Sequence, residues 1–455
     1  MKTRQLTLTA VAFALASLVM AAAPAPARAI EVAFEPDSNL PLVFLNVAVK
    51  AGSVNDPAGQ AGLANFMGEM LLRGTRARSK EQIDLALDQM GARLEVETRA
   101  EALIVRGAVL SSQLEPFLKL VNEIVTEPSF PEGEIRKLKS EVSSQILEEL
   151  GRDPSLAARR FNTYLFHGHP YGKPVLGTTH DINALTRDQI AAHYDRLFKD
   201  ANLLVVGTGD AKSDDIGAWS KALATARAGG QVIAKVDRPQ DGATRRVQIV
   251  DKPERTQTQI NLGEIGVRMT DQDFFPLYLG NFAFGGGSFS ARLMVEIRVK
   301  RGWSYGANSF FRHGLEPRSW QVHLFPAEKD TAAALEQTLK MVQELHDTGI
   351  TPDEFTFAQH ALVNSAGFTF NTPKKRVENR LLERTLDLPD NFMKTFGPEL
   401  QKVKLEEVNA ALKRFLQPGK LAVVVLGTAK NLKEPLAKAA GVPAAQVEVS
   451  PYTQE

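Results

Sequence analysis

Hydrophobic and polar positions follow two periods along this chain, and the same succession of periods occurs twice. Residues 186–210 combine apolar positions at helical spacing with a β-branched run that ends in Gly-Thr. Residues 404–429 repeat this succession, and Gly427 takes the place that Gly207 has in the first copy. Both segments therefore predict an amphipathic helix followed by a buried strand, and the chain contains an internal repeat.

Each copy of the repeat belongs to a longer half that opens with strand patterns. These patterns cover residues 40–52 in the first half and 245–267 in the second, and long helical patterns follow at residues 131–150 and 330–347. Strands followed by helices and a returning strand predict an α+β fold, with a mixed or antiparallel sheet covered by helices. We expect two homologous α/β-sandwich halves that face each other across a cleft, the usual place for a ligand.

The boundary between the halves lies in a stretch rich in Gly, Pro, Asp and Arg that has no sustained periodicity. Such a composition is typical of a linker between domains. We place the linker at residues 237–246, the N-terminal domain at residues 30–236 and the C-terminal domain at residues 247–455.

The first residues of the chain have the features of a targeting segment. Lys2 and Arg4 precede an apolar run, and Ala27-Arg28-Ala29 forms an A-x-A cleavage pattern. We therefore expect residues 1–29 to be a signal peptide and the mature protein to be exported, to the periplasm or as a secreted protein. The apolar run is short for a membrane span and no later stretch approaches one, so no membrane span is expected.

Charge and cysteine content exclude several classes of function. The whole chain has 54 Lys and Arg residues against 53 Asp and Glu residues. Loss of residues 1–29 removes three basic residues and no acidic one, which leaves 51 against 53. No segment is basic enough to predict a nucleic-acid partner. The absence of cysteine excludes disulfides, thiolate metal sites and thiol catalysis.

Candidate chemistry begins with residues 62–75, which read GLANFMGEMLLRGT. Their apolar positions have helical spacing and form one core face. Asn65 and Glu69 are four residues apart, so they lie side by side on the helix, with Gly68 between them. Helices of this outline often carry H-x-x-E-H, which provides two zinc-binding histidines and a general base.

Four segments together carry a family resemblance, and they span residues 62–75, 166–210, 251–263 and 285–309. Over residues 31–441 the chain resembles the insulinase/pitrilysin family of zinc metallopeptidases. Within this family it is similar to the short two-domain form that includes mitochondrial processing peptidase. It resembles the subunit that lacks the zinc-binding motif. The resemblance implies a repeated α+β half, as the periodicity also predicts.

The resemblance implies four zinc-site positions, and all four have changed: they are Asn65, Gly68, Glu69 and Gln145. For the distal position, an offset toward Glu141 or Glu148 stays open. No histidine precedes His167, so no shift of register restores the motif. We expect a solvated or cleft-facing helix surface here rather than a weak metal site at Glu69. This chain alone is then an inactive peptidase homologue without a bound cofactor, and zinc is expected in a partner subunit.

A second family feature is retained in the C-terminal half. Arg298 is followed seven residues later by Tyr305, and the resemblance implies that this pair reaches across the cleft to bind substrate. A guanidinium and a phenol can hold a carbonyl oxygen that gains negative charge. The alternative is structural: a basic residue suits a helix C-terminus, which Gly302 would end, and Tyr305 would start the next strand.

Three further features have weaker functional interpretations. His167 and His169 suggest loop residues more than a metal pair. The run from Gly285 to Ser288 suggests a helix entry or, by resemblance to a glycine-rich loop, a peptide contact. Glu95 and Val96 replace an Asn-Ala pair that the resemblance places on a substrate-contacting strand, although that strand can still receive a peptide through its backbone.

These features favour a non-catalytic, substrate-binding subunit of an exported zinc metalloendopeptidase. It would act on peptides or unfolded segments as a heterodimer with a homologous, zinc-carrying subunit, whose active site it completes. The alternative is a peptidase-derived peptide-binding or assembly protein with no proteolytic role. A self-sufficient hydrolase is disfavoured because the chain has neither cysteine nor a nucleophile elbow.

Overall fold

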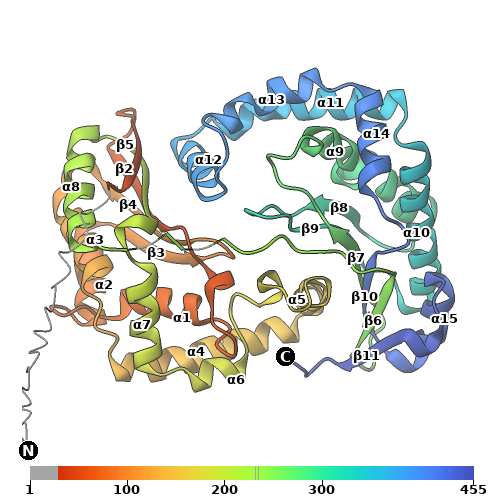
Figure 1. Cartoon of the computed structure of the whole chain (residues 1–455), viewed down its shortest axis with the longest axis horizontal. Helices are drawn as coiled ribbons and strands as arrows, with labels where there is room; N and C mark the ends of the chain where they lie inside the picture. Colours follow the sequence, from red (N-terminus) through yellow and green to blue (C-terminus); the bar gives the residue numbers. More distant parts are fainter. Residues whose placement is uncertain (1–28, 231, 234) are drawn as a thin grey trace, which may run out of the picture.

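The computed structural model describes residues 29–230, 232–233 and 235–455. The predicted signal peptide therefore lies outside the described residues, apart from Ala29. The chain folds into two halves that lie next to each other, each with a sheet backed by helices (Figure 1). Within the described residues, no helix combines the length and the apolar character that a membrane crossing requires.

The first half contains a five-stranded mixed sheet in the order β1-β5-β2-β4-β3. Its strands are β1 Glu31–Pro36, β2 Leu42–Val49, β3 Arg93–Thr98, β4 Leu103–Leu110 and β5 Leu203–Gly209. Its helices are α1 Leu63–Met70, α2 Lys80–Met90, α3 Leu114–Thr126, α4 Glu132–Gly151, α5 Asp153–Leu165, α6 Thr179–Ala184, α7 Arg187–Leu197 and α8 Ser213–Ala226. The pair β1–β5 is parallel and the other pairs are antiparallel.

The second half contains a six-stranded mixed sheet in the order β11-β6-β10-β7-β9-β8. Its strands are β6 Arg246–Asp251, β7 Gln259–Ile265, β8 Ala307–Phe311, β9 Ser319–Leu324, β10 Ala422–Gly427 and β11 Val447–Pro451. Its helices are α9 Phe274–Asn281, α10 Thr331–Thr348, α11 Pro352–Ala366, α12 Pro373–Thr385, α13 Phe392–Lys402, α14 Leu405–Phe415 and α15 Ala429–Ala440. Two π-helical segments, Phe282–Gly286 and Met294–Lys300, follow α9.

The internal repeat is visible in the topology. The order β1-β5-β2-β4-β3 corresponds strand by strand to β6-β10-β7-β9-β8, and in both halves only the first of these pairs is parallel. The structure corrects the pairing of the glycines: Gly427 lies opposite the last residue of β6 as Gly209 lies opposite the last residue of β1, so the counterpart of Gly427 is Gly209 and not Gly207. Close contacts favour glycine at positions 207 and 427 all the same. A Cβ on Gly207 would lie 2.7 Å from the Phe44 carbonyl oxygen, and one on Gly427 would lie 2.6 Å from Leu432 Cδ1. The predicted fold class is confirmed.

One helix from each half packs against the sheet of the other half. The sequence did not predict this exchange. Helix α5 packs against β7 and β10, and α12 packs against β5 and β2 (Figure 1). Val377 and Leu381 of α12 are buried against Ile104, Leu204 and Val206 of the first sheet. These exchanged helices bury apolar faces that would otherwise meet solvent.

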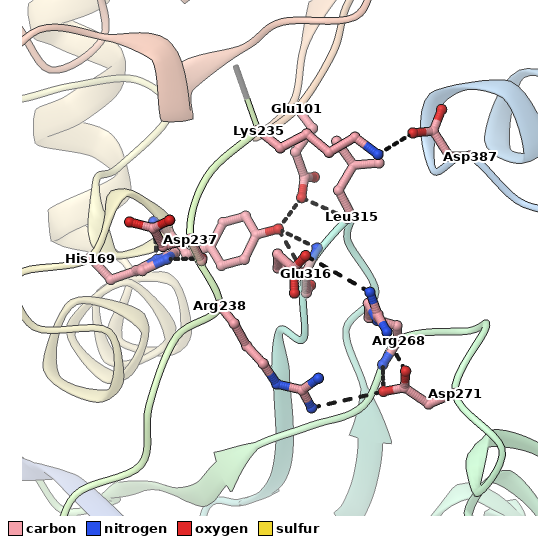
Figure 2. A network of polar contacts seen from close by, with 11 residues as sticks. Glu101, His169, Lys235, Asp237, Arg238, Arg268, Asp271, Leu315, Glu316 and Asp387 are labelled. Atoms are coloured by element: carbon pink, nitrogen blue, oxygen red, sulfur yellow. Dashed lines mark hydrogen bonds and ion pairs between the residues drawn. The ribbon is translucent and has the colours of Figure 1, made fainter. Parts of the chain in front are cut away.

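The described residues between α8 and β6 contain no helix or strand, as expected of a linker. Polar contacts hold this segment to both halves (Figure 2). Lys235 Nζ lies 2.5 Å from a carboxylate oxygen of Asp387, and His169 Nε2 lies 2.8 Å from the Asp237 carbonyl oxygen. His169 is therefore a loop residue bound to the linker. The proposed domain boundaries stay predictions.

Next to the linker, the tip of the β8–β9 hairpin docks into the first half (Figure 2). The Leu315 amide donates to Glu101 Oε1 at 2.9 Å, and the Glu316 amide donates to the Tyr171 hydroxyl oxygen at 3.0 Å. The Tyr171 hydroxyl in turn donates to Glu101. A Cβ on Gly314 would lie 2.6 Å from Glu101 Oε1, so a larger residue at the tip would displace this carboxylate. We call Glu101, Tyr171 and residues 314–316 the clasp.

Candidate functional site

Asn65 and Glu69 lie four residues apart on helix α1. A buried carboxylate caps the N-terminus of this helix. Gly62 takes a left-handed conformation, with φ of 90°, directly before the helix. Asp56 accepts hydrogen bonds from the backbone amides of Gly62 at 2.9 Å and Ala64 at 2.8 Å. This carboxylate therefore satisfies amide groups that a helix start leaves unpaired.

The same carboxylate is almost fully buried, with the charges of Lys173 and Arg196 nearby. Burial raises the pKa of Asp56 to about 7, and the two backbone hydrogen bonds offset part of this rise. His193 Nε2 lies 3.6 Å from Asp56 Oδ1, and burial lowers the pKa of His193 to about 3. The imidazole is thus neutral and provides no compensating charge.

Asn65 and Gly68 are buried, which corrects the expectation of a solvated or cleft-facing surface. A Cβ on Gly68 would lie 2.8 Å from Leu103 Cδ1 and 3.0 Å from Val96 Cγ1. Val96 and Leu103 thus fill the space beside the base position of the motif, and α1 packs directly on β3 and β4. A glutamate at position 68 would displace this packing.

Glu69 is half-buried, and burial raises its pKa. The Glu141 charge adds to this rise, whereas the Arg73 charge opposes it. Arg73 pairs with Glu134 at 3.5 Å and with Glu141 at 3.2 Å. The guanidinium therefore provides positive charge among these carboxylates, together with Lys137, which pairs with Glu134 at 2.6 Å.

The structure distinguishes the three candidates for the distal position. Gln145 and Glu148 are exposed on α4, and Glu148 pairs with Arg152 at 3.6 Å. Glu141 is the candidate whose charge acts on Glu69, and Arg73 already binds it. Within the described residues, no cluster of three or more His, Asp or Glu side chains could hold a metal ion. The residues at α1 do not fit a zinc site.

In the second half, the side chains of the retained pair Arg298 and Tyr305 are in direct contact. Arg298 lies in the π-helical segment Met294–Lys300, and its guanidinium carbon is 4.2 Å from the Tyr305 ring centroid. The same carbon is 4.8 Å from the Phe289 ring centroid. The guanidinium thus contacts two aromatic rings. Tyr305 precedes β8 by two residues rather than starting the strand, and Gly302, with φ of 68°, reverses the chain between Arg298 and Tyr305.

This cluster, which we call the Phe289–Arg298–Tyr305 stack, is open to solvent. Tyr305 is 75% exposed and Phe289 is 64% exposed, which is unusual for aromatic rings. Among the described residues, no carboxylate lies within ion-pair distance of Arg298, although neighbouring Lys300 and Arg301 both pair with Glu296. Its N–H donors are therefore available to a ligand. The sequence identified Arg298 and Tyr305 but missed Phe289, which only the glycine-rich segment before it could have indicated.

A pocket of about 630 Å³ lies along the edge strand β8. Its walls include Gly285 and Gly286 of the glycine-rich run, together with Asn308, Phe310 and His323. The backbone of an edge strand offers unpaired amide and carbonyl groups. At this edge the Ser309 carbonyl accepts a hydrogen bond from Asn281 Nδ2 at 3.2 Å. The glycine-rich run is thus part of a pocket wall next to an edge strand.

Two family models match the chain. Residues 31–179 match the one described as Insulinase (Peptidase family M16), and residues 184–362 match the one described as Peptidase M16 inactive domain. The chain belongs to the insulinase family, peptidase family M16. The boundary between the two matches precedes β5, which completes the sheet of the first half.

Individual relatives agree with this membership. A Helicobacter pylori protein described as non-peptidase homolog YmxG is 24% identical over 408 residues, which cover 89% of this chain and 93% of that protein. An uncharacterized zinc protease of Streptomyces coelicolor is 26% identical over 265 residues, 57% of either chain. The crystal structure of a peptidase M16 inactive domain from Pseudomonas fluorescens superimposes with a TM-score of 0.81 at 25% identity, covering 88% of this chain and 95% of that one.

These likenesses agree with the geometry of α1. The motif positions are replaced, the space beside Gly68 is filled, and a relative that covers most of the chain is described as a non-peptidase homologue. Together they support a non-catalytic role for this insulinase-family chain.

Proposed function

We propose that this chain is the non-catalytic, substrate-binding subunit of an exported zinc metalloendopeptidase. A homologous partner would supply H-x-x-E-H and zinc, and this chain would complete the partner's active site in a heterodimer. The observation that carries the proposal is the Phe289–Arg298–Tyr305 stack, in which a guanidinium with no carboxylate partner in the described part of the chain lies between two exposed aromatic rings.

The physical argument concerns what such a guanidinium can bind. Stacking on aromatic faces restricts the side chain while its N–H groups point outward along the plane, so little entropy is lost when a ligand binds. A guanidinium with a neighbouring phenol can donate to a peptide carbonyl oxygen, and this donation strengthens when the oxygen becomes negatively charged during hydrolysis. Arg298 and Tyr305 would therefore orient and polarise a peptide at the zinc of the partner.

The pocket along β8 supports a peptide or an unfolded segment as the ligand. An extended chain can add to a free strand edge through backbone hydrogen bonds and place its side chains in adjacent pockets. The same pocket also favours the second candidate, a peptide-binding or assembly protein with no proteolytic role. Export rests on the predicted signal peptide alone.

An activity assay tests the proposal and separates the two candidates. The purified chain, a homologue with intact H-x-x-E-H from the same organism, and their mixture are each incubated with an unstructured peptide and zinc. We expect the chain alone to be inactive and the mixture to exceed the homologue alone. Arg298→Ala should reduce this stimulation about 100-fold, as expected when a donor to a developing oxyanion is lost, and Tyr305→Phe should reduce it less.

Lys300→Ala is the matched control, because this neighbouring cation is exposed and pairs with Glu296 instead of being stacked. It should leave the stimulation unchanged. A mixture no more active than the homologue alone would contradict the subunit proposal. If the chain then still binds peptide in fluorescence anisotropy, the peptide-binding candidate is supported.

A further inference from the structure

A pocket of about 700 Å³ lies where the two halves and the last strand meet, away from the Phe289–Arg298–Tyr305 stack. Arg160 and Tyr164 of α5 form one wall, Arg246 at the start of β6 forms another, and Glu448 and Ser450 of β11 form a third. The C-terminal residues pass next to this pocket on their way from β11 to the first half (Figure 1).

Three buried polar atoms in these walls have no hydrogen-bond partner in the described part of the chain. They are Nε of Arg160, Nε of Arg246 and Oγ of Ser450. An unpaired buried donor is energetically costly, so such groups generally have an additional partner. The remaining contacts of the two arginines are with neutral groups. Arg160 donates to the carbonyl oxygens of Pro451 and Gln454, and Arg246 donates to that of Tyr164.

The two guanidinium charges are only partly compensated, because the Glu455 charge acts on Arg160 and the Asp241 charge interacts with Arg246 without a direct ion pair. Neither Arg160 nor Arg246 has a carboxylate within ion-pair distance among the described residues, although Arg160 is only 9% exposed. Burial and the neighbouring Arg159 charge lower the pKa of Arg160, while Glu455 opposes this effect from a greater distance.

The acidic groups of the pocket walls have other partners. Glu448 accepts a hydrogen bond from the Tyr164 hydroxyl at 2.9 Å, and Glu455 accepts one from the Thr179 hydroxyl at 2.6 Å. A buried cation without a counter-ion is costly. An anion in the pocket would remove this cost and pair the unsatisfied donors.

We propose that this pocket binds an oxyanion, a carboxylate or phosphate group of a small ligand, between the guanidinium groups of Arg160 and Arg246. Planar guanidinium groups bind both types of oxyanion through paired, charge-assisted hydrogen bonds. Arg160 belongs to the first half and Arg246 to the second, so the bound anion links the two halves. This site is independent of any role in proteolysis.

Isothermal titration of the full chain tests the site, with sodium phosphate and sodium acetate as separate probes and sodium chloride holding the ionic strength constant. We expect saturable binding of one anion per chain. Arg246→Gln should weaken it at least about tenfold, because charge-assisted hydrogen bonds are lost. Gln248→Glu should do the same, because it adds a negative charge to the wall with almost no change in side-chain size.

Arg136→Gln is the control, since this exposed arginine of α4 lies outside the pocket. Binding of phosphate alone would assign a phosphate ligand, and binding of acetate alone would assign a carboxylate. The proposal is overturned if neither anion binds, or if the wild type and Gln248→Glu bind equally well. Gln248→Glu keeps the test decisive if Arg246→Gln fails to fold.

Discussion

Gly68 shows how a single residue position separates this chain from a zinc peptidase. The change to glycine removes the general base, and it also lets Val96 and Leu103 approach the helix. Apolar side chains now fill the space beside position 68. Restoring the motif residues alone would therefore not restore a zinc site. Asn65 and Glu69 belong to the same packed helix, where the Arg73 charge offsets the charges of Glu69 and Glu141.

The substitution Gly68→Ala tests whether the cost of crowding this packing exceeds the gain in helix propensity. The added Cβ gains about 1 kcal/mol of propensity, but overpacking against Val96 and Leu103 costs about 1–3 kcal/mol. We expect a net loss in the free energy of unfolding, measured by urea denaturation. Gly217→Ala in α8 is the matched control, because its Cβ meets no atom within 4 Å, and it should stabilise the chain. Adding Val96→Ala should rescue Gly68→Ala, and equal stabilisation by both glycine substitutions would contradict this account.

At the scale of the element, α1 depends on a carboxylate that precedes it by several residues. Asp56 provides acceptors for the amides of Gly62 and Ala64, a function that a side chain at the N-cap position often has. Glycine at that position supplies the left-handed turn but has no side chain to accept these bonds. The start of helix α1 therefore depends on the protonation state of Asp56.

This coupling predicts a pH dependence of stability. Burial raises the pKa of Asp56 from 3.8 to about 7 in the folded chain, so the folded state holds a proton that the unfolded state releases at lower pH. The contribution of this carboxyl to stability is full below about pH 4 and is lost as the pH rises through about 7. Urea denaturation should show that wild type loses stability relative to Asp56→Asn between about pH 4 and about pH 7, and little more above that. Parallel pH profiles would contradict the raised pKa.

At the scale of the whole molecule, the two halves form one body through exchanged helices and the clasp. Helix α5 covers the second sheet and α12 covers the first. The Glu101 carboxylate then joins Tyr171 to the amide of Leu315, which lies 214 residues away in the chain. The relative placement of the stack and the first half therefore depends on a few buried polar contacts.

Glu101→Ala should loosen this arrangement. It leaves the Leu315 amide without its acceptor, which costs about 1–3 kcal/mol, and leaves the Tyr171 hydroxyl only the Glu316 carbonyl oxygen at 3.3 Å. Hydrogen exchange by mass spectrometry should show faster exchange in residues 314–316 and a lower free energy of unfolding. Glu336→Ala is the control, because Glu336 is exposed on α10. Unchanged exchange at the hairpin tip would show that the clasp does not hold the halves together.

Much of the fold could be predicted from the sequence. The two periods identified β2, β6, β7, α4 and α10, and the repeat of helix and β-branched strand identified β5 and β10 as equivalent. The family resemblance then identified the replaced motif on α1 and the pair Arg298–Tyr305. These features are local in sequence, because helix and strand periods and short motifs depend on residues within a few turns of each other.

The sequence by itself therefore determined the fold class, the repeat, the replaced zinc motif and the identity of the retained pair. Only the tertiary structure decided which residues lie next to them. The filling of the Gly68 site by Val96, the contact of Phe289 with Arg298, and the exchange of α5 and α12 all depend on the spatial path of the chain. Such contacts join segments whose separation leaves no period in the sequence, and side-chain packing in three dimensions selects them.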